Sequence, residues 1–129
     1  MLRSIPRAAL AALALLAAAP AAASAATADG PVAQAAATCK VPADGRGWGP
    51  TYVTGMRVAR TSCATGKRLV TAYYRCRTAN GGADGRCTKR VQGWRCKEKR
   101  GAAIPTQFDA SVTCRKGRAR VVHTYTQFT

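Results

Sequence analysis

Large aliphatic residues are scarce beyond the first 25 residues of this chain. That part contains one leucine, Leu69, and one isoleucine, Ile104. So few large aliphatic side chains exclude an extensive hydrophobic core, and a domain of about 100 residues with a thin core needs additional stabilisation. The sequence therefore predicts one small domain that depends on covalent cross-links.

Residues that usually carry out chemistry are also scarce. The chain has one histidine, His123, one glutamate, Glu98, and no two cysteines at C-x-x-C spacing. A zinc site requires several cysteine or histidine ligands at short spacing. We therefore expect no metal, no cofactor and no catalytic residue, and predict that the protein is not an enzyme.

An enzyme of another kind, a small secreted nuclease, is an alternative that uses His123 and Glu98. Two acid–base groups must converge on one phosphate for such a reaction. The alternation of residues around His123 places it on the core face of a strand, which favours a structural histidine. Glu98 lies among Lys97, Lys99 and Arg100, which favours a local counterion.

The N-terminal segment has the pattern of a secretory signal peptide. Arg3 and Arg7 precede an apolar run over residues 8–19, and small residues follow as far as Ala25. The run is shorter than the ~20 residues of a membrane-spanning helix. We predict a signal peptide over residues 1–25, a secreted protein that is extracellular or associated with the cell envelope, and no transmembrane segment in the mature form.

The six cysteines follow the predicted cleavage site and would be exported together. An even number in a short secreted chain predicts three disulfides. Cys76 and Cys87 flank a glycine-rich loop and are the first predicted pair. Cys96 with Cys114 across neighbouring strands is favoured next, which leaves Cys39 with Cys63. The pairing of these last four remains open, because a helix lying on a sheet could bring Cys63 to either strand cysteine.

The periodicity predicts one helix and several strands. After a flexible alanine-rich lead (26–38), the domain (39–129) begins with a glycine-rich loop and a strand over 52–59, with a bulge at Gly55. An amphipathic helix over 61–77, capped by Thr61 or Ser62, follows. Its apolar side is formed by seven residues: Cys63, Gly66, Leu69, Val70, Ala72, Tyr73 and Cys76.

Three further strands are expected over 91–97, 110–115 and 118–125. A turn at Lys116–Gly117 would place Cys114 opposite Ala119 and Ala110 opposite His123. The predicted fold class is α+β: one amphipathic helix packed on a three- to four-stranded antiparallel sheet in the order β-α-β-β-β, stapled by three disulfides.

Basic residues are the most abundant unexplained feature. The mature chain would hold nineteen basic and five acidic residues, a formal net charge of +14. Such a surface attracts polyanions, so we predict a noncatalytic monomer that associates with an anionic polymer or membrane surface at the cell envelope, or with a protein partner. The residues expected to bind the anionic partner are Arg95, Lys97, Lys99, Arg100, Arg115, Lys116, Arg118 and Arg120.

The sequence also bears on two binding functions other than association with an anionic surface. Specific nucleic-acid recognition is not expected, because the aromatic residues needed for base stacking are mostly assigned to the core. A secreted inhibitor of an exogenous hydrolase is an alternative, which would insert an exposed loop at 78–86 or 101–107 into an active site.

Three short motifs suggest a resemblance to known proteins. They are Ser62-Cys63-Ala64-Thr65-Gly66, Gly93-Trp94-Arg95-Cys96 and Cys114-Arg115-Lys116-Gly117. Over residues 61–122 the chain resembles small secreted actinobacterial proteins of unassigned function, in which a helix opens Ser-Cys-Ala-Thr-Ala. The resemblance implies export and a helix-on-sheet fold but no functional residue. Cys76 and Cys87 are additional to the shared pattern, which fits their pairing with each other.

Overall fold

A computed structural model describes residues 36–129. The predicted signal peptide and most of the predicted lead lie outside the described residues. One helix and five strands make up the domain, together with a short 3-10 helix. Their bounds are β1 (Ala37–Cys39), β2 (Tyr52–Ala59), α1 (Cys63–Ala79), η1 (Gly82–Asp84), β3 (Arg95–Ile104), β4 (Gln107–Lys116) and β5 (Ala119–Phe128).

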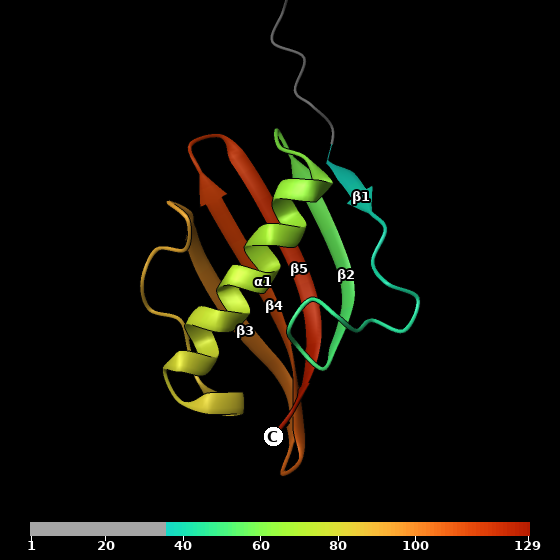
Figure 1. Cartoon of the computed structure of the whole chain (residues 1–129), viewed down its shortest axis with the longest axis vertical. Coiled ribbons are helices and arrows are strands. Elements are labelled where there is room, and N and C mark those ends of the chain that lie inside the picture. The colour runs from blue at the N-terminus through green and yellow to red at the C-terminus, as the bar shows by residue number, and fades with distance from the viewer. Residues whose placement is uncertain (1–35) are drawn as a thin grey trace, which may run out of the picture. The chain divides into compact units, whose positions relative to one another are not determined.

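The strands form one antiparallel sheet in the order β1-β2-β5-β4-β3. Helix α1 crosses one face of this sheet diagonally (Figure 1), and the two layers enclose the core. The α+β class and the single helix on an antiparallel sheet are confirmed. The face of the sheet away from α1 is called the outer face below.

Helix α1 begins where the sequence predicts. The Ser62 hydroxyl caps it by accepting a hydrogen bond from the backbone N–H of Thr65 at 3.1 Å, which satisfies one of the free amides of the first turn. Gly66, Leu69 and Tyr73 are buried against the sheet. A Cβ on Gly66 would lie 2.8 Å from the Met56 sulfur, so a glycine at this position allows the helix to approach β2 closely.

The thin core is filled mainly by valines and aromatic residues. With Leu69 buried and Ile104 exposed at the tip of the β3–β4 hairpin, one large aliphatic residue is left for the interior. Aromatic side chains bury large areas and compensate for missing leucines. The main core residues are Trp48, Val53, Met56, Val58, Leu69, Val70, Tyr73, Trp94, Phe108, Val112, Val121 and Tyr125.

The sheet has one strand more than predicted. Strand β1 pairs with β2, with Ala37 opposite Val58 and Cys39 opposite Met56. The predicted lead therefore ends before Ala37, two residues earlier than expected. A three-residue strand of alanine, threonine and cysteine has no periodic pattern, and its position is set by backbone pairing with β2 and by the disulfide of Cys39.

The bulge predicted in β2 is present. The register shifts between Val53 and Gly55, which inserts one residue into the strand. Val53 and Met56, three residues apart, are consequently both buried. Simple alternation had placed Val53 on the face opposite Met56, which is wrong because of this extra residue.

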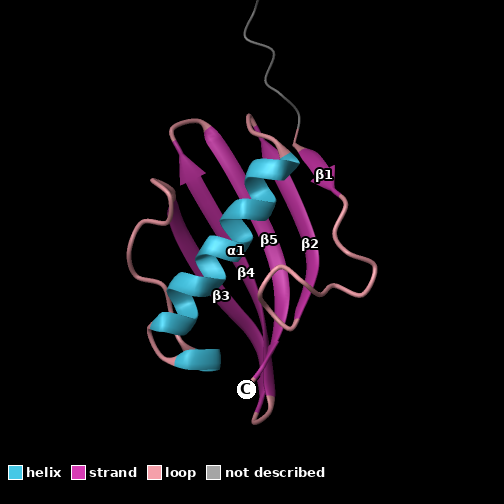
Figure 2. Ribbon diagram, viewed as in Figure 1, coloured by secondary structure: helices cyan, strands magenta, loops and turns pink. Residues whose placement is uncertain are grey.

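Strand β3 forms one edge of the sheet (Figure 2). It starts later and ends later than the predicted strand over 91–97. Gln92 and Gly93 both have positive φ, and the backbones of Val91 and Trp94 exchange two hydrogen bonds around them. This tight turn occupies the beginning of the predicted strand. The segment 101–107, expected as an exposed loop, is instead mostly strand, with a turn at Pro105–Thr106.

The β4–β5 hairpin differs from prediction by two residues in register. Its turn is formed by Gly117 and Arg118, so Cys114 lies opposite Val121 and Ala110 opposite Tyr125. Gly117 has a φ of 56°, and glycine favours the first central position of such a turn. A shift of two residues keeps every side chain on its predicted face.

All three disulfides follow the favoured pairing. Cys39–Cys63 joins β1 to the start of α1, Cys76–Cys87 anchors the end of α1, and Cys96–Cys114 links directly paired positions on β3 and β4. Three such bonds indicate an oxidising environment for folding.

Candidate polyanion-binding surface

Three arginines from three neighbouring strands form one row on the outer face. Arg95 of β3 pairs with Arg115 of β4, and Arg115 pairs with Arg120 of β5. All three side chains are exposed. Neighbouring strands lie about 4.8 Å apart, so the three guanidinium groups emerge from adjacent points of the sheet. We call this set the arginine row.

Further cations and hydroxyl groups continue the outer face beyond the arginine row. Lys97 and Arg57 stand at the two ends of the next row, separated by Thr113 and Val122. Lys99 begins the row after that, beside Ser111 and Thr124. Guanidinium, ammonium and hydroxyl groups all donate hydrogen bonds to phosphate or carboxylate oxygens.

The arginine row has no acidic counterpart on this face. Asp109, the carboxylate of the outer face, accepts a hydrogen bond from the Thr126 hydroxyl at 2.5 Å. It lies six residues along β4 from Arg115, about 20 Å at the rise of a strand. Within residues 36–129 the ion pairs are those of Arg86 and Arg100 with Glu98, and Glu98 is on the other face.

Shallow hollows connect these side chains. One of about 280 Å³ is lined by Arg95, Lys97, Thr113 and Arg115. A second of about 260 Å³ includes Arg57 and Arg120. A third, about 450 Å³, extends past Lys99 toward Asp109. The outer face is therefore open and shallowly grooved, a shape that suits an extended chain better than a compact small molecule.

The structure brings most of the predicted binding residues together. Arg95, Lys97, Lys99, Arg115 and Arg120 share the outer face, whereas Lys116 and Arg118 lie at the end of β4 and in the following turn. The sequence-based set omitted Arg57, which β2 places on the outer face through its pairing with Val122. The alternation of residues along β2 places Arg57 on the outward side, and this pattern could have identified it from the sequence.

Arg100, also in the predicted set, lies on the helix side of the sheet. Its Nε donates to Glu98 Oε1 at 2.7 Å, and its Nη2 donates to the backbone carbonyls of Asp84 and Gly85 at 3.0 and 2.7 Å. Its guanidinium carbon is 3.9 Å from the centroid of the Phe108 ring. Arg100 thus ties β3 to the loop after α1 and is not presented to a ligand on the outer face.

Glu98 is the acceptor at the centre of a polar cluster between helix and sheet. Its side chain is 4% exposed, and its Oε2 accepts hydrogen bonds from the hydroxyls of Tyr73 at 3.0 Å and Tyr125 at 2.6 Å. Burial alone would raise the Glu98 pKa, but the hydrogen bonds from Tyr125 and Arg100, the charge of Arg100 and the Tyr73 bond together hold the pKa below its usual value. Burial and Glu98 raise the pKa of both tyrosines.

His123 lies beside this cluster and is 1% exposed. Its ring centroid is 5.9 Å from that of Tyr73 and 6.0 Å from that of Tyr125. Burial lowers the His123 pKa to about 4, with the charge of Arg77 acting in the same direction and Glu98 opposing it. Asp109, the acidic residue of the neighbouring strand β4, is on the opposite face of the sheet. This placement favours a neutral, structural histidine.

Arg77 is a buried cation that the sequence did not single out. It is 0% exposed, and it donates to the carbonyl of Ala83 and, at 2.7 Å, to Gln127 Oε1. Its guanidinium carbon lies 5.2 Å from the Tyr125 ring centroid and 5.4 Å from that of Tyr74. Arg77 continues the buried side of α1 four residues after Tyr73, which was the signal for its position.

Residues 36–129 contain neither a cluster of metal ligands nor a membrane-spanning helix. No group of three or more histidine, cysteine, aspartate or glutamate side chains in residues 36–129 could hold a metal ion. In the same range, no helix has both the length and the apolar character needed to cross a bilayer.

Comparisons with known proteins place the chain in no established family. No family profile, no curated protein and no solved structure matches it. The resemblance to small secreted actinobacterial proteins therefore stays a prediction from three motifs.

Proposed function

We propose that this protein is a secreted, cationic, noncatalytic domain that binds an extended anionic polymer of the cell envelope through the outer face of its sheet. The observation that carries this proposal is the arginine row, in which Arg95, Arg115 and Arg120 are direct cross-strand neighbours without an acidic partner. Like charges placed directly opposite each other destabilise a sheet. A bound polyanion would replace this repulsion with charge-assisted hydrogen bonds.

The composition of the outer face favours a hydrophilic polymer over insertion into a membrane. The apolar residues beside the arginine row are Val122 and Ala59, and both are small. The two tryptophans, Trp48 and Trp94, are buried, and the exposed aromatic ring of Phe128 lies at the end of β5 far from Arg120. Stacking on nucleic-acid bases would need exposed aromatic residues beside the cations. Recognition would therefore act on phosphate or carboxylate groups along the polymer.

The buried position of the acid–base residues supports a binding role over catalysis. His123 and Glu98 are both enclosed between α1 and the sheet, and Tyr73 and Tyr125 cover them. A substrate phosphate would have to enter the core to reach either group. The three disulfides support export, because they require an oxidising compartment.

Sedimentation with purified cell envelopes tests the proposal. Binding should be strong near 50 mM salt and largely lost at about 500 mM salt, because ions screen exposed charges. Binding that is unchanged between the two salt concentrations would contradict the proposal.

A charge-matched pair of variants shows which surface is responsible. The arginine-row variant carries Arg95→Gln, Arg115→Gln and Arg120→Gln. The control variant loses three exposed cations of the loops, at Lys40, Lys89 and Arg90, through the same exchange for glutamine. We expect the arginine-row variant to lose envelope binding and the control variant to keep most of it. Equal losses would mean that net charge alone is responsible.

A further inference from the structure

A second basic surface lies on the helix side of the domain. A groove of about 380 Å³ runs between the solvent-facing side of α1 and the turn over residues 91–94. We call it the helix groove. Its lining residues are Lys67, Arg68, Thr71, Ala72, Arg75 and Gln92.

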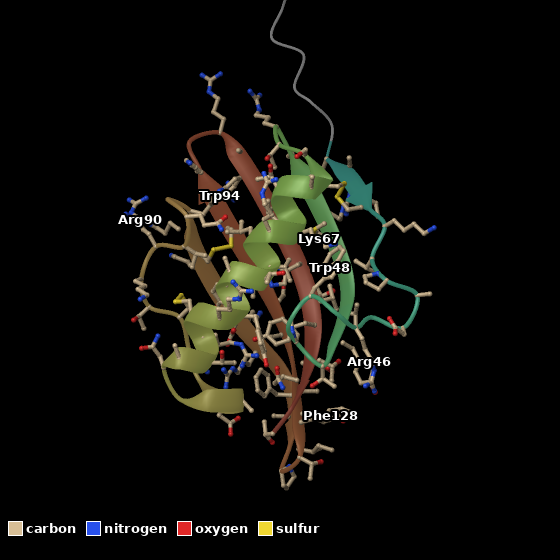
Figure 3. All side chains as sticks on the ribbon, in the orientation of Figure 1. Arg46, Trp48, Lys67, Arg90, Trp94 and Phe128 are labelled. Carbon is tan, nitrogen blue, oxygen red and sulfur yellow. A yellow bond between two sulfur atoms is a disulfide. The ribbon has the colours of Figure 1, made fainter. Side chains whose placement is uncertain are left out.

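The three cations of the helix groove are exposed and free of ion pairs. Lys67 and Arg75 are eight residues apart on α1, so they lie on the same side of the helix about 12 Å apart. The Lys67 ammonium is 5.7 Å from the centroid of the Trp48 ring (Figure 3), and Arg68 Nη2 donates to the Thr65 hydroxyl at 3.1 Å. None of these contacts neutralises the positive charge.

Carboxylates are absent from this part of the sequence. No aspartate or glutamate occurs between Asp44 and Asp84, a span that includes all of α1. Exposed helices usually carry acidic residues that pair with lysine and arginine one turn away. Within residues 36–129 the cations of the groove form no ion pair, so they give it a positive potential that attracts anions.

The opposite wall of the groove is held in place by the core. Trp94 is buried, and its backbone exchanges hydrogen bonds of 2.8 and 2.9 Å with Val91 around the turn. Gln92, at the tip of this turn, is exposed with a φ of 50°. Gln92 lines the groove, and a glutamine amide can donate hydrogen bonds to an anion.

We propose that the helix groove is a second anion-binding site, which makes the domain bivalent and able to join two segments of polyanion. This inference rests on the proposed function of the outer face. A helix with its side chains is about 10–12 Å thick, more than the Debye length of ~8 Å at physiological ionic strength. Two anionic segments on opposite layers are therefore screened from each other and can be held together.

A sandwich assay with long-chain polyphosphate as the probe tests bivalency. The protein is bound to a polyphosphate-coated surface at low salt, washed, and exposed to fluorescently labelled polyphosphate. Retained protein reports the first site, and captured label reports bridging. We expect the wild type to retain protein and to capture label. Retained protein without captured label would overturn bivalency and leave the proposed function standing, whereas no retained protein would contradict the proposed function itself.

Matched variants assign the second site to the helix groove. A groove variant with Lys67→Gln, Arg68→Gln and Arg75→Gln should retain protein on the surface within about twofold of wild type but capture at least fivefold less label. The control variant at Lys40, Lys89 and Arg90 has the same net charge and should capture label normally. Normal capture by the groove variant, or an equal loss in the control variant, would overturn the assignment.

Discussion

Arg115 on β4 and Arg120 on β5 are direct cross-strand partners on the exposed face of the sheet, and Arg95 on β3 extends the pair to a row of three. No carboxylate of the outer face lies near them, because Asp109 is at the far end of β4. Three neighbouring guanidinium groups repel one another in the free protein. Stability and binding should therefore respond in opposite directions when this charge is removed.

The first prediction concerns the middle residue of the row. Arg115→Thr should raise the free energy of unfolding by about 0.5–1 kcal/mol at low salt, because it removes two repulsive pairs and introduces a residue with good strand propensity. Urea denaturation at low and high salt measures the effect, which should shrink as salt screens the repulsion. The same variant should bind polyphosphate more weakly.

Arg57→Thr is the matched control for this prediction. Arg57 is on the same face, but its direct partners are Val122 and Thr38. Its replacement should change stability less and with little dependence on salt. If Arg115→Thr proved clearly less stable than wild type at low salt, the arginine row would not be repulsive, and the physical basis of the proposed site would be wrong.

The second prediction concerns the buried carboxylate. Glu98→Gln should lower the free energy of unfolding by about 3 kcal/mol, because it leaves the buried Arg100 without its charge partner. Thermal or urea denaturation near pH 7 measures the loss. Asp109→Asn, at an exposed carboxylate with one hydrogen bond to Thr126, should cost less than about 1 kcal/mol. Similar costs for the two variants would contradict the central role of Glu98.

The pKa of Glu98 also predicts a pH dependence below its ordinary value. Since the folded pKa is lowered, the unfolded chain takes up a proton first as the pH falls. The stabilisation by ionised Glu98 is therefore complete above about pH 4.5 and is lost as the pH falls through the folded pKa. Glu98→Gln should remove this part of the acid destabilisation.

The third prediction concerns His123 at a higher pH. Its folded pKa is about 4, whereas an unfolded histidine titrates near 6.5. The unfolded chain therefore binds more protons between these values, and stability should fall as the pH is lowered from about 6.5 to 4, by on the order of 3 kcal/mol. Urea denaturation across this range measures the slope.

His123→Leu separates this effect from other titrations. The variant should show a flatter dependence of stability on pH between 4 and 6.5, whatever its absolute stability. The ionisable groups around the ring are Tyr73, Tyr125, Glu98 and Arg77. Burial raises the pKa of both tyrosines, so they stay neutral in that range, and Glu98→Gln removes the contribution of Glu98. A wild-type protein equally stable at pH 4.5 and 6.5 would contradict the neutral, buried state of His123.

The fourth prediction concerns the disulfide at the end of α1. Replacing Cys76 and Cys87 together by alanine should lower the free energy of unfolding by about 3 kcal/mol, because the unfolded chain gains the entropy of an opened loop. Denaturation under non-reducing conditions measures the cost. Peptide mapping of the exported wild type should find Cys39–Cys63, Cys76–Cys87 and Cys96–Cys114, and free thiols at these positions would contradict the architecture.

The sequence predicted the helix and the strand faces because both depend on local periodicity. Ser62 caps α1 as expected, and the two-residue shift in the β4–β5 hairpin left Val121, His123 and Tyr125 on the core face. Strand β1 and the length of β3 were not predictable in this way. Strand β1 depends on pairing with β2 across the glycine-rich loop, and the end of β3 depends on pairing with β4 in a hairpin. Ala37 and Gly101 carry no local signal for either pairing.

The residues of the candidate site were likewise predictable only where local periodicity determines their position. Alternation along β3 and β4 correctly separated Arg95, Lys97 and Arg115 from the core. Arg100 was misplaced because the predicted strand ended at Lys97. Continued to residue 100, the same alternation places Arg100 on the core face with Glu98, to which it donates a hydrogen bond. The direct alignment of Arg95, Arg115 and Arg120 requires the register of three strands, which only the structure supplies.

The salt dependence of polyphosphate binding tests the role of the arginine row most directly. Each phosphate contact contributes close to one unit to the slope of log affinity against log salt concentration. Removing the three arginines of the row should lower the magnitude of the slope by about 2, since contacts to single-stranded polyanions contribute ~0.7 each. The control variant at Lys40, Lys89 and Arg90 should keep the wild-type slope. An arginine-row variant that retains the wild-type slope and affinity would contradict binding through the outer face.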